Sequence, residues 1–200
     1  MFCLSRTKKT KRGENIQTKK LSEISEIHTG VRLNRLKEKN TSLKKVIKKI
    51  SSENIFEYEY SIESVPNSIN EKFISQKNDI IISLLDPGSV CKLEKEGLII
   101  PMQFAIIRLD ENYNADFIIN LLKSNLFKKE LNKLVEGSGL KIIKSTYLKE
   151  VKLPLPDYEK QEKIGELLKL IEKRIILNSK TIELEKQAKD AILNKTIGGN

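Results

Sequence analysis

The stretch LPLPDYEKQEKIGELLKLIEKRI, residues 153–175, decides how the end of this chain folds. Pro154 and Pro156 lack the backbone N–H that an inner strand must donate, so a strand has to end here or lie at a sheet edge. Asp157 is a suitable N-cap residue for a following helix. Nothing interrupts the helical pattern over 158–196, which predicts a helix of about 60 Å at about 1.5 Å per residue. A globular head does not need a helix of that length, so we expect much of it to project.

Apolar residues along this predicted helix form two stripes. A helix that packs only on its own domain needs one stripe, so two stripes predict two neighbours, one along each. An ordinary coiled-coil dimer is the simpler interpretation of the same pattern. Asn178 lies beside the first stripe, either exposed or as a buried polar residue that fixes the register of helix pairing. The first stripe contains Ile164, Leu168, Ile171, Ile175 and Ile182, and the second contains Leu170, Leu177, Leu184 and Ala191.

Positive charge is concentrated at the start of the chain. Residues 1–50 contain 15 Lys and Arg against 4 Asp and Glu, whereas residues 51–200 contain 22 against 23. Clustered positive charge favours nucleic acid, because binding to phosphates releases counterions. We expect residues 1–18 to form a basic tail with few apolar anchors. Beyond it we expect a folded basic face that contacts phosphates. Its candidate residues are Arg32, Arg35, Lys44, Lys45, Lys48 and Lys49.

The hydrophobic pattern predicts a mixed α+β head. The β-branched run 80–82 indicates a strand, and the Asp-Pro-Gly sequence of residues 86–88 indicates a turn after it. The run 41–51 fits a helix or a strand equally well. The remaining expected elements are a short helix over 21–30 that stops at Gly30, strands over 56–65, 102–110 and 151–155, a helical hairpin over 115–137 and a short helix over 145–151. No apolar run is long enough for a membrane span or a signal peptide, so we expect a cytoplasmic protein.

The order of motifs at the end of the chain resembles the specificity (S) subunit of Type I restriction–modification systems. In that family, a target-recognition domain ends in a strand with an I-P-[LI]-P element, followed by P-x-x-x-Q-x-x-I and a long conserved-region helix. The matching residues here are Leu153, Pro154, Leu155, Pro156, Gln161 and Ile164. The segments LSEISEIHTG, DIIISLLDPGSV and GLIIPMQFAIIRL are similar to earlier parts of such a domain. The resemblance covers roughly residues 21–196.

The basic tail (1–18) lies outside the family pattern. For the rest of the chain, the resemblance implies a DNA-binding recognition domain (19–156) and a long coiled-coil-type helix (157–197). Family members usually carry two recognition domains and two helices, whereas this chain has one of each. Two copies would then associate through antiparallel helices and read a symmetric, interrupted site. Pairing with a different half and a truncated relic are the alternatives. By position in the family, further candidate DNA-binding residues are Lys92, Gln103, Ser138, Lys141 and Lys144.

The implied function is not catalytic. Such a subunit binds duplex DNA and positions an adenine methyltransferase (M) subunit, and a restriction (R) subunit joins the complex, with no cofactor or metal in the S subunit itself. His28 is the only histidine and falls in an expected short helix, so we expect neither a His-based triad nor a His-rich metal site. Two other interpretations stay open. Glu150-Val151-Lys152 matches a nuclease-like E-x-K triplet and would suit a small metal-dependent nuclease, and a coiled-coil regulator could bind the methyltransferase without reading DNA.

Overall fold

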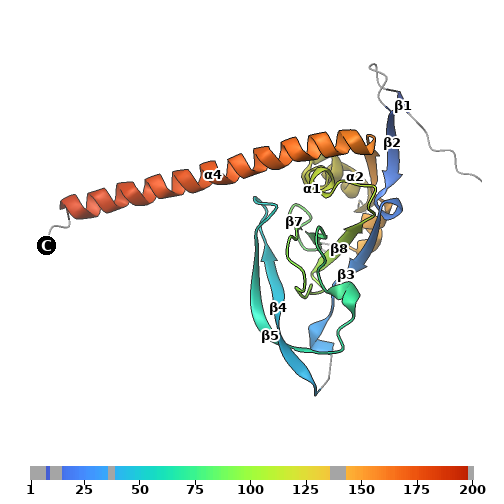
Figure 1. Cartoon of the computed structure of the whole chain (residues 1–200), viewed down its shortest axis with the longest axis horizontal. Coiled ribbons are helices and arrows are strands. Elements are labelled where there is room, and N and C mark those ends of the chain that lie inside the picture. Colours follow the sequence, from blue (N-terminus) through green and yellow to red (C-terminus); the bar gives the residue numbers. More distant parts are fainter. Residues whose placement is uncertain (1–7, 10–14, 36–38, 136–142, 198–200) are drawn as a thin grey trace, which may run out of the picture.

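The computed structural model describes residues 8–9, 15–35, 39–135 and 143–197. A head of mixed α+β structure carries one 40-residue helix, which leaves the head and projects far beyond it (Figure 1). This arrangement confirms the fold class expected from the sequence.

A four-stranded antiparallel sheet forms the centre of the head. Its order is β3-β8-β6-β7, with β3 at Ser25–Thr29, β8 at Phe104–Leu109, β6 at Ile80–Ser83 and β7 at Val90–Lys92. Ile80 and Ile82 belong to one core cluster and Ile81 to another. Successive side chains of a strand point to opposite faces, so an uninterrupted isoleucine run indicates a strand that is covered on both faces.

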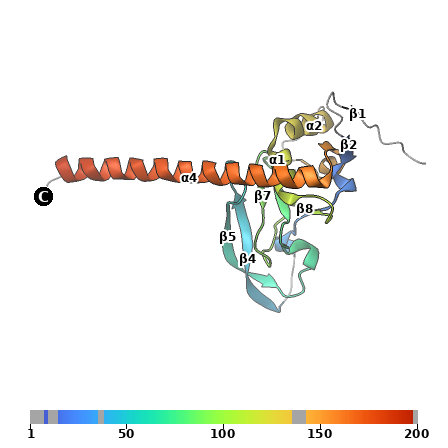
Figure 2. The same cartoon turned by 45° about the horizontal axis from the view of Figure 1, so that its top comes forward.

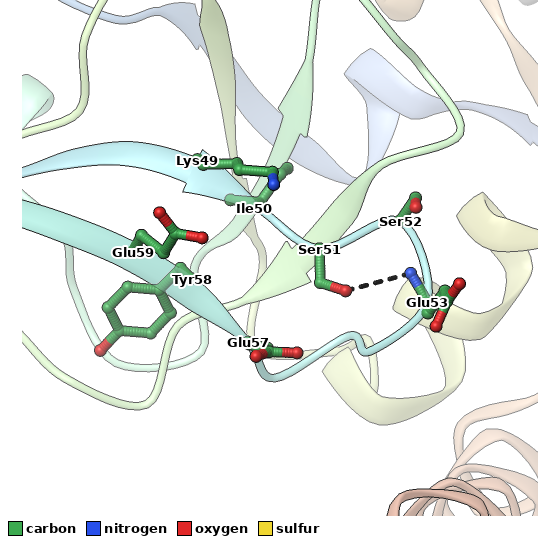
Figure 3. A pocket seen from close by; sticks show the side chains of 8 residues that line it. All are labelled: Lys49, Ile50, Ser51, Ser52, Glu53, Glu57, Tyr58 and Glu59. Carbon is green, nitrogen blue, oxygen red and sulfur yellow. Dashed lines mark hydrogen bonds between the residues drawn. The ribbon is translucent and has the colours of Figure 1, made fainter. Parts of the chain in front are cut away.

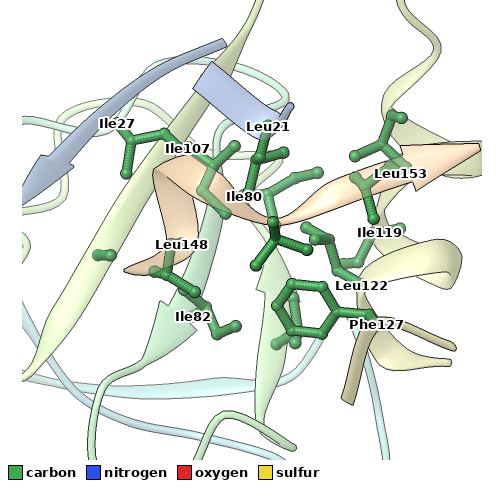
Figure 4. Packing of buried hydrophobic residues seen from close by; sticks show 14 of the residues in the cluster. Leu21, Ile27, Ile80, Ile82, Ile107, Ile119, Leu122, Phe127, Leu148 and Leu153 are labelled. Carbon is green, nitrogen blue, oxygen red and sulfur yellow. The ribbon is translucent and has the colours of Figure 1, made fainter. Parts of the chain in front are cut away.

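Helices cover one face of this sheet. They are α1 (Ala115–Lys123), α2 (Asn125–Val135) and α3 (Ser145–Glu150), and the expected helical hairpin is present with Ser124 as its only connecting residue. Figure 4 shows Ile119, Leu122 and Phe127 of the hairpin facing Ile80 of the sheet, with Leu148 of α3 beside Ile82. This core fixes α1 on the sheet, and α1 in turn supports the long helix.

A two-stranded ribbon covers the other face. It consists of β4 (Thr41–Ile50) and β5 (Tyr58–Pro66), with a bulge between Ile47 and Lys49. The ambiguous run 41–51 is therefore a strand. Ile47 and Ile50 pack in the cluster that contains Ile81, while Val46 packs in a third cluster. The ribbon is attached through hydrogen bonds with Ile99, whose N–H donates to the carbonyl of Lys45 at 2.9 Å. A short 3-10 helix, η3 (Glu71–Phe73), follows the ribbon.

Part of the segment expected as a basic tail (1–18) forms strands, and its remaining residues lie outside the described ranges. β2 (Asn15–Lys20) pairs with β1 (Lys8–Lys9) on one side and antiparallel with β9 (Lys152–Leu155) on the other. The polar sequence of β2 does not predict a strand, because its hydrogen-bonding partner lies more than 130 residues further along the chain. β9 lies at the edge of this three-stranded sheet, which suits Pro154 because its backbone has no N–H to donate to a further strand.

The expected helix over 21–30 is also wrong. Only Leu21–Glu23 forms a 3-10 helix, η1, and β3 follows it directly. Ile24 and Ile27 are buried. The segment is nevertheless a strand, because residues 25–29 pair with the backbone of β8, and a helix would leave those groups of β8 without these partners. Gly30 does not stop a helix. A Cβ at this position would lie 2.2 Å from the carbonyl oxygen of Pro101, so the glycine permits a close approach of two backbones.

The long helix α4 spans Tyr158–Ile197. Asp157 caps its start, because its carboxylate accepts a hydrogen bond from the Lys160 N–H at 2.9 Å. The first part of α4 crosses the head beside α1, and both views show the remainder leaving the head (Figures 1 and 2). Every residue over 177–197 is exposed, which corresponds to roughly 30 Å of projecting helix.

Candidate nucleic-acid interface

One edge of the four-stranded sheet gathers segments that are far apart in the sequence. The register pairs Thr29 with Ala105, Ala105 with Ile82, and Ile82 with Val90. β3 and β6 therefore end at the edge where β8 and β7 begin. We call the segments that meet there the loop edge. It consists of residues 30–35, which include the 3-10 helix η2 (Leu33–Arg35), together with residues 84–89, 101–103 and 143–145.

Backbone hydrogen bonds join these segments into one surface. The Met102 N–H donates to the carbonyl of Val31 at 2.9 Å, and the Leu84 N–H donates to the carbonyl of Gln103 at 2.9 Å. The Ile143 N–H donates in turn to the carbonyl of Leu84 at 2.9 Å. The backbones of these segments are therefore held at fixed positions relative to one another, which gives the side chains on the loop edge the rigid support that direct readout of base edges requires.

The loop edge contains four of the candidate DNA-binding residues. Arg32, Arg35 and Lys144 are exposed there, and Gln103 is half-buried. These four come from three separate parts of the chain, so their proximity is a product of the sheet topology. The candidates Ser138 and Lys141 lie outside the described residues.

The lysines of the ribbon are placed differently. Lys44 faces Glu63 and Lys49 faces Glu59 across the ladder. Lys48 forms an ion pair with Glu63, and the hydrogen bond from Lys48 is the main cause that lowers the pKa of the Glu63 carboxyl. The positive charge of β4 is therefore largely compensated by β5. Sequence reasoning missed this compensation because the acids come at least nine residues after the lysines that they face.

Lys45 is the exception among the ribbon lysines, because its neighbour across the ladder is apolar. It faces Ile62, and its ammonium lies 4.9 Å from the centroid of the Tyr60 ring. A cation over an aromatic face is stabilised without losing its charge. Lys45 is therefore the ribbon lysine best placed to contact a phosphate.

An open hollow lies at the turn of the ribbon, with Lys49 on one side (Figure 3). The Ser51 hydroxyl accepts a hydrogen bond from the Glu53 N–H at 3.1 Å, which shapes the turn. Three carboxylates line the hollow against a single lysine, so it does not suit a phosphate group. Its lining residues are Lys49, Ile50, Ser51, Ser52, Glu53, Glu57, Tyr58 and Glu59.

Lys92 is not on the surface. Its side chain is 3% exposed and forms an ion pair with Asp116 of α1, with its ammonium 5.6 Å from the ring centroid of Phe56. Asp116 also pairs with Lys169 of α4 at 3.3 Å. Its position in the family suggested a DNA-binding residue, but β7 runs through the core, so Lys92 joins the sheet to α1 and α4 and is not placed to contact DNA.

Replacing Lys92 by methionine is expected to lower the free energy of unfolding by about 3 kcal/mol, because it leaves the largely buried Asp116 carboxylate with only one cationic partner. Chemical denaturation measures this loss. The additional change Asp116→Asn should recover part of it, since it removes the carboxylate that has lost its partner. Lys95→Met, at an exposed position, is the matched control and should change stability by less than about 0.5 kcal/mol. Equal effects of the two lysine substitutions would show that the buried pair is not important.

Polar contacts fix the start of α4 on α1. Gln161 is buried, its side-chain oxygen accepts from the Asn114 N–H at 3.2 Å, and its amide nitrogen donates to the Pro156 carbonyl at 2.9 Å. A Cβ on Gly165 would lie 2.4 Å from the side-chain oxygen of Asn114, so the glycine permits close packing. Further along, Glu172 is buried beside Lys123. The direction of the helix is thus set by the head. Gln161 is one of the residues that match the family motif, so the sequence pointed to it. No local signal in the sequence indicates that Gly165 allows the close packing of α4 on α1.

Both apolar stripes of α4 are uncovered beyond the head. In the first stripe, Ile164 and Leu168 are half-buried, whereas Ile171, Ile175 and Ile182 are exposed. The three leucines of the second stripe, Leu170, Leu177 and Leu184, are 55–64% exposed. Extended apolar surface of this kind typically marks a site of protein–protein interaction. Asn178 is exposed in the single chain, as is Leu167, which belongs to neither predicted stripe.

The groups considered for catalysis are not assembled into a site. His28 contacts Glu26 on its own strand at 3.5 Å, and Glu150 pairs with Lys20 at 2.6 Å. Burial raises the pKa of the Cys91 thiol to about 12, so the thiol stays protonated near neutral pH. Within the described ranges, no group of three or more His, Cys, Asp or Glu side chains is close enough to hold a metal ion. None of the helices in these ranges is long and apolar enough to cross a membrane.

The chain thus combines a mixed α+β head, which carries the loop edge, with a long helix whose two apolar stripes are uncovered beyond the head. Residues 13–186 match the family model described as the Type I restriction modification DNA specificity domain, and the chain belongs to this family. The Type I restriction enzyme MjaVIII specificity subunit of Methanocaldococcus jannaschii is 29% identical over 136 residues. That alignment covers 64% of this chain and 32% of the relative.

Solved structures share the fold. The HsdS subunit from Thermoanaerobacter tengcongensis superposes with a TM-score of 0.56 at 19% identity, covering 92% of this chain and 45% of that subunit. The Type I restriction–modification S subunit from M. genitalium gives a TM-score of 0.59 at 17% identity, covering 96% and 48%. The chain therefore spans about a third of the curated relative and about half of each solved subunit.

Proposed function

We propose that this chain is a half-size DNA specificity subunit of a Type I restriction–modification system. The observation that carries the proposal is the family match over residues 13–186, which includes both the head and most of α4. In this proposal, residues 19–156 form the recognition domain and bind duplex DNA through the loop edge. Arg32, Arg35 and Lys144 contact phosphates, and Gln103 contacts a base edge.

The helix, residues 157–197, joins two copies. The second stripe of one copy packs against the second stripe of the other in an antiparallel pair, which places the two heads at opposite ends. A two-fold dimer of this kind reads a symmetric target with two separated half-sites. Pairing with a different half-subunit would use the same stripe and produce an asymmetric target.

The first stripe then remains available for an adenine methyltransferase subunit, and a restriction subunit joins the same complex. The chain itself needs no cofactor and supplies no catalytic group. Its contribution is to place the partner on a defined adenine, which must leave the base stack before methyl transfer. A regulator that binds the methyltransferase without DNA, or a nuclease that uses Glu150 and Lys152, would behave differently in the experiment that follows.

The proposal predicts salt-dependent binding of the full chain to duplex DNA. After selection of a preferred target from a random duplex pool, Arg32→Ala with Lys144→Ala should reduce the slope of log affinity against log salt by about 2. Lys48→Ala with Lys49→Ala is the matched control, because it removes the same charge from positions where acids on β5 already compensate it. Fluorescence anisotropy measures both slopes.

Three results would contradict this assignment. A loss of slope in the Lys48/Lys49 variant, with none in the Arg32/Lys144 variant, would move the interface to the ribbon. No binding by the unchanged chain, together with capture of a methyltransferase, would favour the regulator. Magnesium-dependent cleavage of DNA that is lost in Glu150→Gln would favour the nuclease.

A further inference from the structure

The turn after β6 is held by an unusually complete set of hydrogen bonds. The Ser83 hydroxyl accepts from the Leu85 N–H at 3.3 Å and the Asp86 N–H at 3.1 Å. The Asp86 carboxylate accepts from the Gly88 N–H at 3.2 Å and from the Ser89 hydroxyl at 2.6 Å. The Ser89 N–H also donates to the Asp86 carbonyl at 2.9 Å. The turn is therefore ordered by its own side chains, with no need of a ligand.

This ordered turn holds a leucine out in solvent. Leu85 is 60% exposed, whereas the preceding Leu84 is buried and bonds to the backbone of Gln103. Met102, which directly precedes Gln103 in the chain, is also exposed. A single exposed leucine is ordinary. Here, however, two large apolar side chains lie on neighbouring segments of the loop edge, and the backbone of each segment is fixed.

Cationic groups lie near each of the two segments that carry this apolar pair. The Arg32 Nε lies 3.0 Å from the Met102 sulfur. The Lys128 ammonium lies 3.7 Å from the position that a Cβ on Gly88 would occupy, three residues after Leu85. The major groove of duplex DNA has a matching layout, with phosphates along both rims and the C5-methyl groups of thymines on its floor. An acidic amphipathic protein segment would match the charges but would not require the fixed backbone.

We propose that Leu85, supported by Met102, reads thymine by contact with its C5-methyl group. Gln103 lies beside this pair and is suited to the N6 and N7 groups of adenine, so an A·T pair satisfies both contacts. Arg32 and Lys128 bind the flanking phosphates. This inference rests on the proposed function, and it names the base pair that the loop edge selects.

The test uses the full chain and its selected target duplex. Each thymine is replaced in turn by deoxyuridine, which removes only the methyl group and keeps the base pairing. Unchanged protein should lose roughly fourfold in affinity at one or more positions in each half-site, as expected for one apolar carbon. Leu85→Ala should bind the thymine target more weakly and should no longer distinguish thymine from deoxyuridine at that position. Leu85→Met should keep most of the discrimination.

Leu43→Ala is the control, because Leu43 is also an exposed leucine but lies on β4 of the ribbon, outside the segments of the loop edge. It should retain the full response to deoxyuridine. Thermal melting should be unchanged in all three variants, since neither leucine is part of the core. A target without A·T pairs in its half-sites, or a Leu85→Ala protein that still responds to deoxyuridine, overturns the inference while DNA binding itself stands. Absence of DNA binding by the unchanged chain overturns both the inference and the proposed function.

Discussion

Glutamate at Leu170, Leu177 and Leu184 together is expected to convert a dimer into a monomer. The three side chains are exposed in the single chain and recur every seven residues on the projecting helix. Complete burial of a leucine contributes about 2 kcal/mol, and these leucines are 55–64% exposed, so three of them on each of two copies would contribute about 7 kcal/mol to association. That is comparable with the free energy of a complex with a micromolar dissociation constant. Sedimentation velocity over a range of protein concentrations measures the change.

The matched control adds the same three negative charges elsewhere on the helix. Ser179→Glu, Asn194→Glu and Thr196→Glu lie at least about 60° around the helix from every residue of the second stripe, given a rotation of about 100° per residue. All three positions are exposed, and this variant should remain dimeric. Both variants should keep the melting transition of the head, because the substituted leucines do not contact the core. A leucine variant that still sediments as a dimer would show that the stripe is not the dimer interface.

Alanine at Gly30 is expected to disrupt the loop edge and to destabilise the head. The added Cβ would lie 2.2 Å from the carbonyl oxygen of Pro101 and 2.4 Å from that of Ile100. Both are backbone atoms held by hydrogen bonds, from the Val31 N–H to the Ile100 carbonyl at 2.8 Å and from the Phe104 N–H to the Pro101 carbonyl at 3.0 Å, so they cannot move aside as the end of a side chain can. Overpacking of this kind costs about 3 kcal/mol. For a chain of this size the melting temperature should fall by roughly 10 °C.

Gly88→Ala provides the comparison on the same edge. A Cβ there would meet the Asp86 side chain at 3.2 Å and the flexible end of Lys128 at 3.7 Å. Its effect on stability should therefore be within about 0.5 kcal/mol. Calorimetry of both variants measures the difference. Similar melting temperatures for Gly30→Ala and the unchanged protein would mean that the two backbones are further apart than the structure places them.

The long helix and the loop edge are both attached rigidly to the same head. Gln161, Gly165 and the Lys123–Glu172 pair fix α4 on the head, and hydrogen bonds fix the loop edge on the same head. In a dimer formed through α4, the separation and relative rotation of two loop edges would then be set by the protein. A fixed spacing between half-sites follows from this rigidity without any further contact.

The sequence by itself determined the features that depend on near neighbours. The prolines and Asp157 set the end of β9 and the start of α4, and the isoleucine run set β6, because capping, missing donors and side-chain alternation all act within a few residues. The two apolar stripes of α4 could also be found from the sequence, because the residues that share one face of a helix follow from the helical repeat alone.

Only the tertiary structure decided where charge and hydrogen-bonding partners are found. It turned residues 25–29 into a strand by pairing them with β8, and it placed Glu59 and Glu63 opposite the ribbon lysines. It also buried Lys92 and brought the parts of the loop edge together. The reason is physical: strand register joins residues tens to more than a hundred positions apart, and neither propensity nor local charge in a single sequence specifies that register.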